Sequence, residues 1–183
     1  YGYKRLEMKD GGSTMIKLVT ERLNILPLQA HNLALSVDNY EKMQIELGLR
    51  VSSTTLDEGM QYAMKVRLRK VLENVENYLW LTNWAIIHKE KNQIIGFIML
   101  KGCPNKMGEV IVGYGIEEEY RKNGYATEAL KKLTKWIFEN PKALSIIADT
   151  EKMNVPSHKV LKNVGAIKYK ETRSEEHTSE LQS

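Results

Sequence analysis

The arrangement of this chain is set most strongly by residues 112–130, which read VGYGIEEEYRKNGYATEAL. A strand pattern ends at Ile116, a polar turn contains Gly124, and apolar residues recur at helical spacing from Tyr125 onward. One face of that helix is apolar and the opposite face is basic. The apolar face carries Ala126, Ala129, Leu130, Leu133 and Ile137, and the basic face carries Lys131, Lys132 and Lys135. The sequence therefore predicts a strand, a tight turn and a helix in immediate succession.

The start of such a helix is a place where anions bind. The first backbone N–H groups of a helix lack partners within it, and the helix dipole puts partial positive charge there. Gly124 leaves the backbone uncovered and accepts a positive φ, while Arg121 and Lys122 add flexible positive charge. The alternative is an ordinary strand-to-helix connection with basic residues on its surface, and spacing alone favours neither interpretation.

Neither of the two common phosphate loops fits this turn. The nucleoside-triphosphate pattern G-x-x-x-x-G-K-[ST] does not occur in the chain. The dinucleotide pattern fails because Gly113 and Gly115 are followed by Glu118, where a glycine is needed.

Residues 121–126, Arg-Lys-Asn-Gly-Tyr-Ala, resemble the acyl-coenzyme A signature R/Q-x-x-G-x-G/A of the GCN5-related N-acetyltransferase (GNAT) superfamily. The approach strand GEVIVGYGI, the continuation at 124–129 and a later Asn154-x-x-Ser157 are also similar to that family. Near the start, Thr-Glu-Arg-Leu-Asn-Ile at 20–25 resembles the first strand of the subgroup that includes ribosomal-protein alanine N-acetyltransferases. The resemblance extends over residues 18–169 and is specific for the family, but it does not specify the substrate.

The resemblance implies an α+β fold with three layers, α/β/α, around a central mixed sheet that is mostly antiparallel. A parallel, right-handed crossover is expected at the acyl-CoA site. The residue pattern supports strands at 21–28, 84–88, 94–100, 109–116, 144–148 and from 166, and helices at 30–47 and after a capping box at 55–58. The last strand of the family is expected to be missing, because the chain first reaches a polar tail.

The resemblance also implies direct transfer of an acetyl group from acetyl-CoA to a primary amine. An attacking amine must be neutral, so the site needs a proton acceptor and then a donor for the leaving thiolate. Glu109 is the only carboxylate on the strand before the turn and is the candidate general base, ranked above the glutamates at 117–119. Ser157 is the candidate acid by resemblance. The alternatives are a solvated glutamate at a strand end and an ordinary helix serine.

The implied cofactor-binding positions lie mainly at the strand end, the turn and the helix start. They are Tyr114, Gly115, Ile116, Arg121, Lys122, Asn123, Gly124, Tyr125, Ala126 and Thr127, together with Asn154 for the pantetheine arm. Asn154 is equally suited to cap a helix. The acceptor stays open among a protein N-terminal amine, a polyamine and another small amine, and the first-strand resemblance favours the N-terminal amine.

The composition indicates one globular domain between two foreign ends. The chain has 183 residues, 42% of them hydrophobic, and a net charge of +4. No apolar run approaches the roughly 20 residues that span a bilayer, and the lone Cys103 fits a reducing cytoplasm. Residues 1–14 are expected to be a non-native or upstream extension, 15–172 the acetyltransferase domain, and 173–183 a tail that looks like the in-frame translation of a sequencing-adapter oligonucleotide.

Two other functions stay open at this stage. A catalytically degenerate acyl-CoA-binding module would keep the turn and lose the acceptor site. A small basic nucleic-acid-binding protein is less consistent with the chain, because its basic residues are spread out and form no stripe with aromatic residues. The four histidines are scattered, so no metal site is expected, and neither a membrane nor a nucleic-acid partner is predicted.

Overall fold

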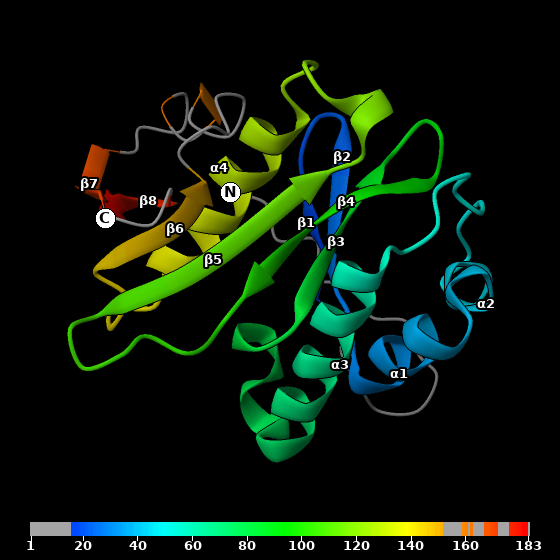
Figure 1. Ribbon diagram of the computed structural model, residues 1–183, viewed down its shortest axis with the longest axis horizontal. Coiled ribbons are helices and arrows are strands. Elements are labelled where there is room, and N and C mark those ends of the chain that lie inside the picture. The colour runs from blue at the N-terminus through cyan, green and yellow to red at the C-terminus, as the bar shows by residue number, and fades with distance from the viewer. Residues whose placement is uncertain (1–15, 152–158, 161, 163–166, 172–175, 183) are drawn as a thin grey trace.

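The computed structural model describes residues 16–151, 159–160, 162, 167–171 and 176–182. Within these residues one mixed sheet has the strand order β1-β2-β3-β4-β5-β6-β8-β7 (Figure 1). The strands are β1 (Leu18–Val19), β2 (Leu23–Pro27), β3 (Asn83–His88), β4 (Gln93–Leu100), β5 (Glu109–Ile116), β6 (Ser145–Glu151), β7 (Ile167–Glu171) and β8 (Glu176–Gln182). The α-helices are α1 (Ala30–Asp38), α2 (Tyr40–Glu46), α3 (Glu58–Glu73) and α4 (Tyr125–Phe138), with 3-10 helices η1 (Val75–Trp80) and η2 (Glu118–Tyr120).

Helices cover both faces of the sheet, as the burial of β3 demonstrates. All six residues of β3 are buried, although successive side chains of a strand point to opposite faces. Trp84 and Ile86 belong to the apolar cluster that includes α4, while Ala85 and Ile87 belong to the cluster that includes α1, α2 and α3. A fully buried isoleucine side chain, such as that of Ile86, contributes about 2 kcal/mol to the free energy of folding. The predicted three-layer α+β arrangement is confirmed.

The hairpin and the crossover also follow the sequence pattern. β3 and β4 pair antiparallel, and β5 pairs antiparallel with β4. β5 and β6 pair parallel and are joined through α4, which is the predicted crossover. The apolar stripe of α4 is buried against the sheet, and its Trp136 ring packs on Trp80 and Trp84 with centroids 4.9 and 5.0 Å apart.

The helical region before β3 differs from its prediction in two places. The single helix expected at 30–47 is divided at Asn39, whose side-chain oxygen accepts a hydrogen bond from the Lys42 N–H and caps α2. This local bond competes with helix continuation. The helix expected to be capped from Thr55 is instead capped by Asp57, whose Oδ1 accepts from the Met60 N–H at 2.7 Å.

The expected absence of a final strand is wrong for the described residues. Glu176–Gln182 forms β8, which lies between β6 and β7 and pairs antiparallel with both. Strand pairing uses backbone N–H and C=O groups, so a polar segment completes a ladder as well as an apolar one. The backbone groups of β6 that the prediction left unpaired have β8 as their neighbour. The origin of residues 173–183 stays a prediction.

Candidate functional site

The strand that leads to the predicted anion-binding turn separates from its parallel neighbour. β5 and β6 pair from Glu109 with Ser145 to Val112 with Ala148, and their ladder ends there. β5 nevertheless continues along β4 to Ile116, and β6 continues along β8 to Glu151. Figure 1 shows β5 and β6 running in the same general direction, with the arrowhead of β5 lying farther along than that of β6. The sheet is therefore split between these two strands on the side where β5 enters the turn.

The turn that is predicted to bind anions has an unusual backbone conformation. Lys122 has φ of 64° and Gly124 has φ of 78°, so two left-handed residues lie within one short turn. Gly124 is the N-cap of α4 and makes no side-chain cap. Asn123 holds the turn internally, because its Nδ2 donates to the carbonyl oxygens of Tyr120 and Arg121 at 3.2 and 3.0 Å. Residues 121–124 are exposed, so the start of α4 is accessible.

Arg22, at the turn between β1 and β2, reaches this site from a distant part of the chain. Its Nη1 donates to the carbonyl oxygen of Asn123 at 2.9 Å, and its Nε donates to Glu128 Oε1 at 3.3 Å. Its guanidinium carbon lies 4.4 Å from the centroid of the Tyr125 ring. Arg22 has no predicted role beyond its place in the first-strand resemblance, because these contacts join segments far apart in the chain.

Tyr125, the first residue of α4, is held on another side by His88 at the end of β3. The rings are edge to face with centroids 5.3 Å apart, and His88 Nε2 lies 3.0 Å from the Tyr125 hydroxyl. The Lys91 N–H donates to His88 Nδ1, so in the neutral ring the proton is on Nε2 and the tyrosine oxygen accepts it. The residue pattern predicts His88 only as the last residue of a strand.

Glu109, the predicted base, lies at the first residue of β5. The carboxylate is half-buried, and its Oε2 accepts from Asn105 Nδ2 at 3.0 Å. It is on the paired end of the strand, about 23 Å along an extended chain from Ile116. Its catalytic role stays a prediction.

Glu117 differs from the other two glutamates of its run. Glu118 and Glu119 are exposed, whereas Glu117 is half-buried and accepts hydrogen bonds from Thr54 Oγ1 at 3.0 Å and Ser52 Oγ at 3.2 Å. Burial raises the pKa of Glu117 above the usual value, although the two hydroxyls act in the opposite direction. Glu117 is therefore partly shielded from solvent, unlike Glu118 and Glu119. Its position directly after buried Ile116 was the available signal.

The comparisons with known proteins bear on this arrangement. A family model described as an acetyltransferase (GNAT) domain matches residues 22–167. The chain belongs to the GNAT acetyltransferase family. It is 26% identical over 154 residues to the uncharacterized N-acetyltransferase YjdG of Bacillus subtilis (strain 168), a match that covers 84% of this chain and 90% of that protein.

Solved structures agree with this GNAT fold. The ribosomal-protein-S5-alanine acetyltransferase from Vibrio fischeri aligns with a TM-score of 0.67 at 17% identity, over 91% of this chain and 96% of that one. RimJ from Mycobacterium smegmatis, in a complex with CoA-disulfide, aligns with a TM-score of 0.62 at 15% identity, over 92% of this chain and 87% of that one. At such identities the likeness establishes the fold.

Some of the remaining predicted cofactor-binding residues lie near the turn and the start of α4. Tyr114, Gly115 and Ile116 lie on the part of β5 beyond the end of its ladder with β6. Ala126 and Thr127 follow Tyr125 in the first turn of α4 and are half-buried. Arg121 is directed back to the strand, since its Nε donates to the Ile116 carbonyl at 2.9 Å. Asn154 and Ser157 lie outside the described residues.

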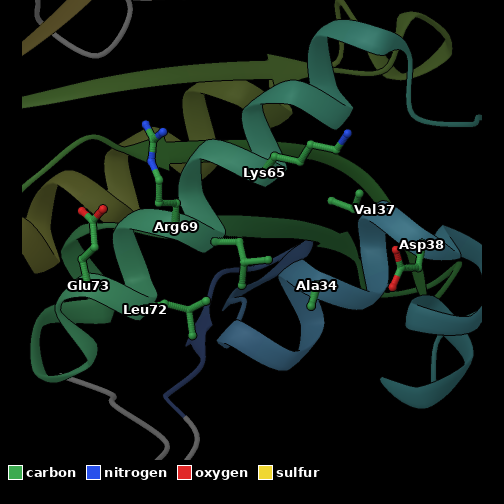
Figure 2. A pocket seen from close by; sticks show the side chains of 8 residues that line it. Ala34, Val37, Asp38, Lys65, Arg69, Leu72 and Glu73 are labelled. Atoms are coloured by element: carbon green, nitrogen blue, oxygen red, sulfur yellow. The ribbon is translucent and has the colours of Figure 1, made fainter.

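A surface groove lies elsewhere, between α1 and α3. Figure 2 shows Lys65 and Arg69 extending from α3 beside the apolar side chains, with Ala34, Val37 and Asp38 on the facing helix. The full lining is Ala34, Val37, Asp38, Lys65, Leu68, Arg69, Leu72 and Glu73. None of the predicted site residues contributes to it, so we assign the groove no part in the chemistry.

Two kinds of feature are absent from the described residues. No helix among them is long and apolar enough to cross a membrane. They also contain no group of three or more His, Cys, Asp or Glu side chains arranged to hold a metal ion.

Proposed function

We propose that this chain transfers an acetyl group from acetyl-CoA to a primary amine. The observation that carries the proposal is the end of β5, where the strand parts from β6 and then enters the exposed turn before α4. A split sheet accommodates an extended arm, and the N-terminus of a helix accommodates phosphate groups. Gly113 and Gly115 fit such an arm. A Cβ added at Gly115 would meet nothing within 4 Å, and one at Gly113 would meet only Lys101 Cε at 3.9 Å.

The proposed reaction assigns separate tasks to the two ends of the site. Acetyl-CoA supplies the thioester; the amine nitrogen forms the new C–N bond as the C–S bond breaks. Glu109 takes the proton that the attacking amine loses, and Ser157 gives a proton to the departing thiolate. Residues 114–116, 121–127 and Asn154 hold the coenzyme. The backbone N–H groups at the start of α4 are the part of this set best placed for the phosphates.

A protein N-terminal amine is the acceptor class that we propose. The first-strand resemblance supports it, and so does the similarity to a Vibrio fischeri enzyme named for the alanine of ribosomal protein S5. The exposed thiol of Cys103 supports action in the reducing cytoplasm.

Calorimetric titration of acetyl-CoA into the full chain tests the coenzyme site. We expect a dissociation constant between about 1 μM and 1 mM, the range of ordinary enzyme KM values. Failure to bind would refute the anion-binding role of the turn.

Release of free thiol then tests the transfer. Three acceptors are compared: a peptide with a free N-terminal alanine, the same peptide with a blocked N-terminus, and spermidine. Glu109→Gln is expected to lower kcat by about 100-fold or more while coenzyme affinity is kept. Glu139→Gln, an exposed glutamate at the far end of α4, is the matched control. Full turnover by Glu109→Gln would refute the base role, and binding without turnover of any acceptor would identify an acyl-CoA-binding module instead.

A further inference from the structure

We propose that Arg22 is a positioning residue that holds the anion-binding turn in its binding geometry; this inference rests on the proposed function. Arg22 makes three chemically different contacts, to a turn carbonyl, to a carboxylate in the first turn of α4 and to an aromatic face. Their targets are Asn123, which directly precedes the N-cap of α4, and Tyr125 and Glu128, which lie in its first turn. A single planar fork therefore connects the β1–β2 turn to the segment that would meet the phosphates.

The turn requires external support because its backbone is strained. Lys122 is a non-glycine residue at φ of 64°, a conformation that costs on the order of 1 kcal/mol. The Asn123 carbonyl that accepts from Arg22 lies between this residue and Gly124, the second left-handed position. The internal bonds of Asn123 use its side chain, so the bond from Arg22 is an independent restraint on its main chain.

Glu128 makes the geometry of Arg22 difficult to replace. Its Oε1 accepts from Arg22, while its Oε2 is buried and has no hydrogen-bond partner among the described residues. The guanidinium is thus the cation that compensates a mostly covered carboxylate, whose side chain is 19% exposed. An amine at position 22 would keep the charge but lose the fork and most of the stacking on Tyr125.

The contacts of Arg22 allow an experiment to distinguish a positioning role from a direct effect of its positive charge. The Arg22 side chain is 41% exposed, so a direct electrostatic effect on a bound phosphate is the rival explanation. Arg22→Lys separates the two, because it preserves the charge and removes the two-pronged contact. Positioning predicts that lysine fails to restore the native behaviour, whereas charge alone predicts that it succeeds.

The first test uses the ligand-free full chain, so that it does not depend on acetyl-CoA binding. Amide hydrogen exchange is compared between the native protein and Arg22→Lys, with Arg69→Lys on the exposed face of α3 as the control. We expect exchange in residues 121–128 to become at least about fivefold faster in Arg22→Lys, with β3 unchanged. Unchanged exchange at 121–128 would overturn the proposal, and faster exchange throughout β3 as well would replace it with a general stability role.

The second test measures the coenzyme. In Arg22→Lys the KM for acetyl-CoA is expected to rise about tenfold or more, while kcat and the KM for the amine stay within about threefold; a tenfold change corresponds to about 1.4 kcal/mol. Native affinity in Arg22→Lys with weakened affinity in Arg22→Gln would establish the charge explanation and overturn positioning. A native protein that binds no acetyl-CoA would refute the proposed function, and the exchange comparison would still decide the structural role of Arg22.

Discussion

Two glycines near the site meet different physical needs. Gly124 supplies the positive φ that starts α4, as the turn pattern predicted. Gly96 on β4 allows close approach instead, since a Cβ there would overlap the carbonyl oxygen of Gly115 and lie 2.9 Å from Ile116 Cδ1. The close approach at Gly96 results from the register between β4 and β5, which pairs the next residue, Phe97, with Gly115. A pattern of residues along one strand contains no information about that register.

Gly96→Ala should therefore destabilise the fold. The added methyl group meets backbone atoms that cannot move without disturbing the ladder, so we expect the free energy of unfolding to fall by about 2–3 kcal/mol. Urea denaturation followed by circular dichroism measures the change. Gly115→Ala is the matched control on the facing strand, where a Cβ has open space, and its loss should stay below about 1 kcal/mol. Equal losses in the two variants would contradict this explanation.

At the scale of elements, the sequence predicted segments with strong periodicity and missed contacts between distant segments. The β3–β4 hairpin, the strand β5 and the amphipathic helix α4 are all signalled by local spacing. The division between α1 and α2 depends on one side chain, because Asn39 accepts a hydrogen bond from a backbone N–H. The contacts of Arg22 and Glu117 arise only after folding brings their partners close, so residue spacing could not indicate them.

The loop before α3 is joined to the end of β5 through Glu117, and this junction should respond to pH. Because burial raises the pKa of Glu117, the folded state holds its proton more tightly than the unfolded chain does. The resulting stabilisation is complete below the unfolded pKa, about 4.3, and is lost as the pH rises through the folded pKa. Glu117→Gln stays neutral and can still accept from Thr54 and Ser52.

Thermal unfolding at two pH values tests this junction. The melting temperature of Glu117→Gln minus that of the native protein should be larger at about pH 7 than at about pH 4. Glu118→Gln, on an exposed neighbour, controls for the change in net charge. A difference for Glu117→Gln that does not vary with pH, beyond that of the control, would show that its burial has no thermodynamic effect.

At the scale of the whole molecule, the described sheet depends on its last strand. β7 is joined to the rest of the sheet through β8, since β8 pairs with both β6 and β7. The polarity of residues 173–183 predicts that they add no strand, which is why β8 is not expected from the sequence. Hydrophobic patterning identifies strands that contribute to a core, but it underestimates strands that complete a ladder mainly through their backbone.

Ser179→Pro should accordingly weaken the whole sheet. Ser179 pairs with Ala148 on one side and Lys168 on the other, and proline removes the backbone donor of this central position. We expect the melting temperature to fall by about 5 °C or more, with Ser179→Ala as the control for loss of the hydroxyl. The same melting temperature for the proline variant and the native protein would exclude a structural contribution from β8.

The split between β5 and β6 also affects how this site could be blocked and how resistance could arise. Gly113 and Gly115 have no side chains of their own to cover the main chain along this part of β5. A compound that forms hydrogen bonds with main-chain groups interacts with atoms that every substitution except proline retains. Escape would then require added bulk over the strand, and the same bulk would obstruct the coenzyme arm that we propose to lie there. Inhibitors shaped like the edge of a strand would thus leave the enzyme few routes to resistance.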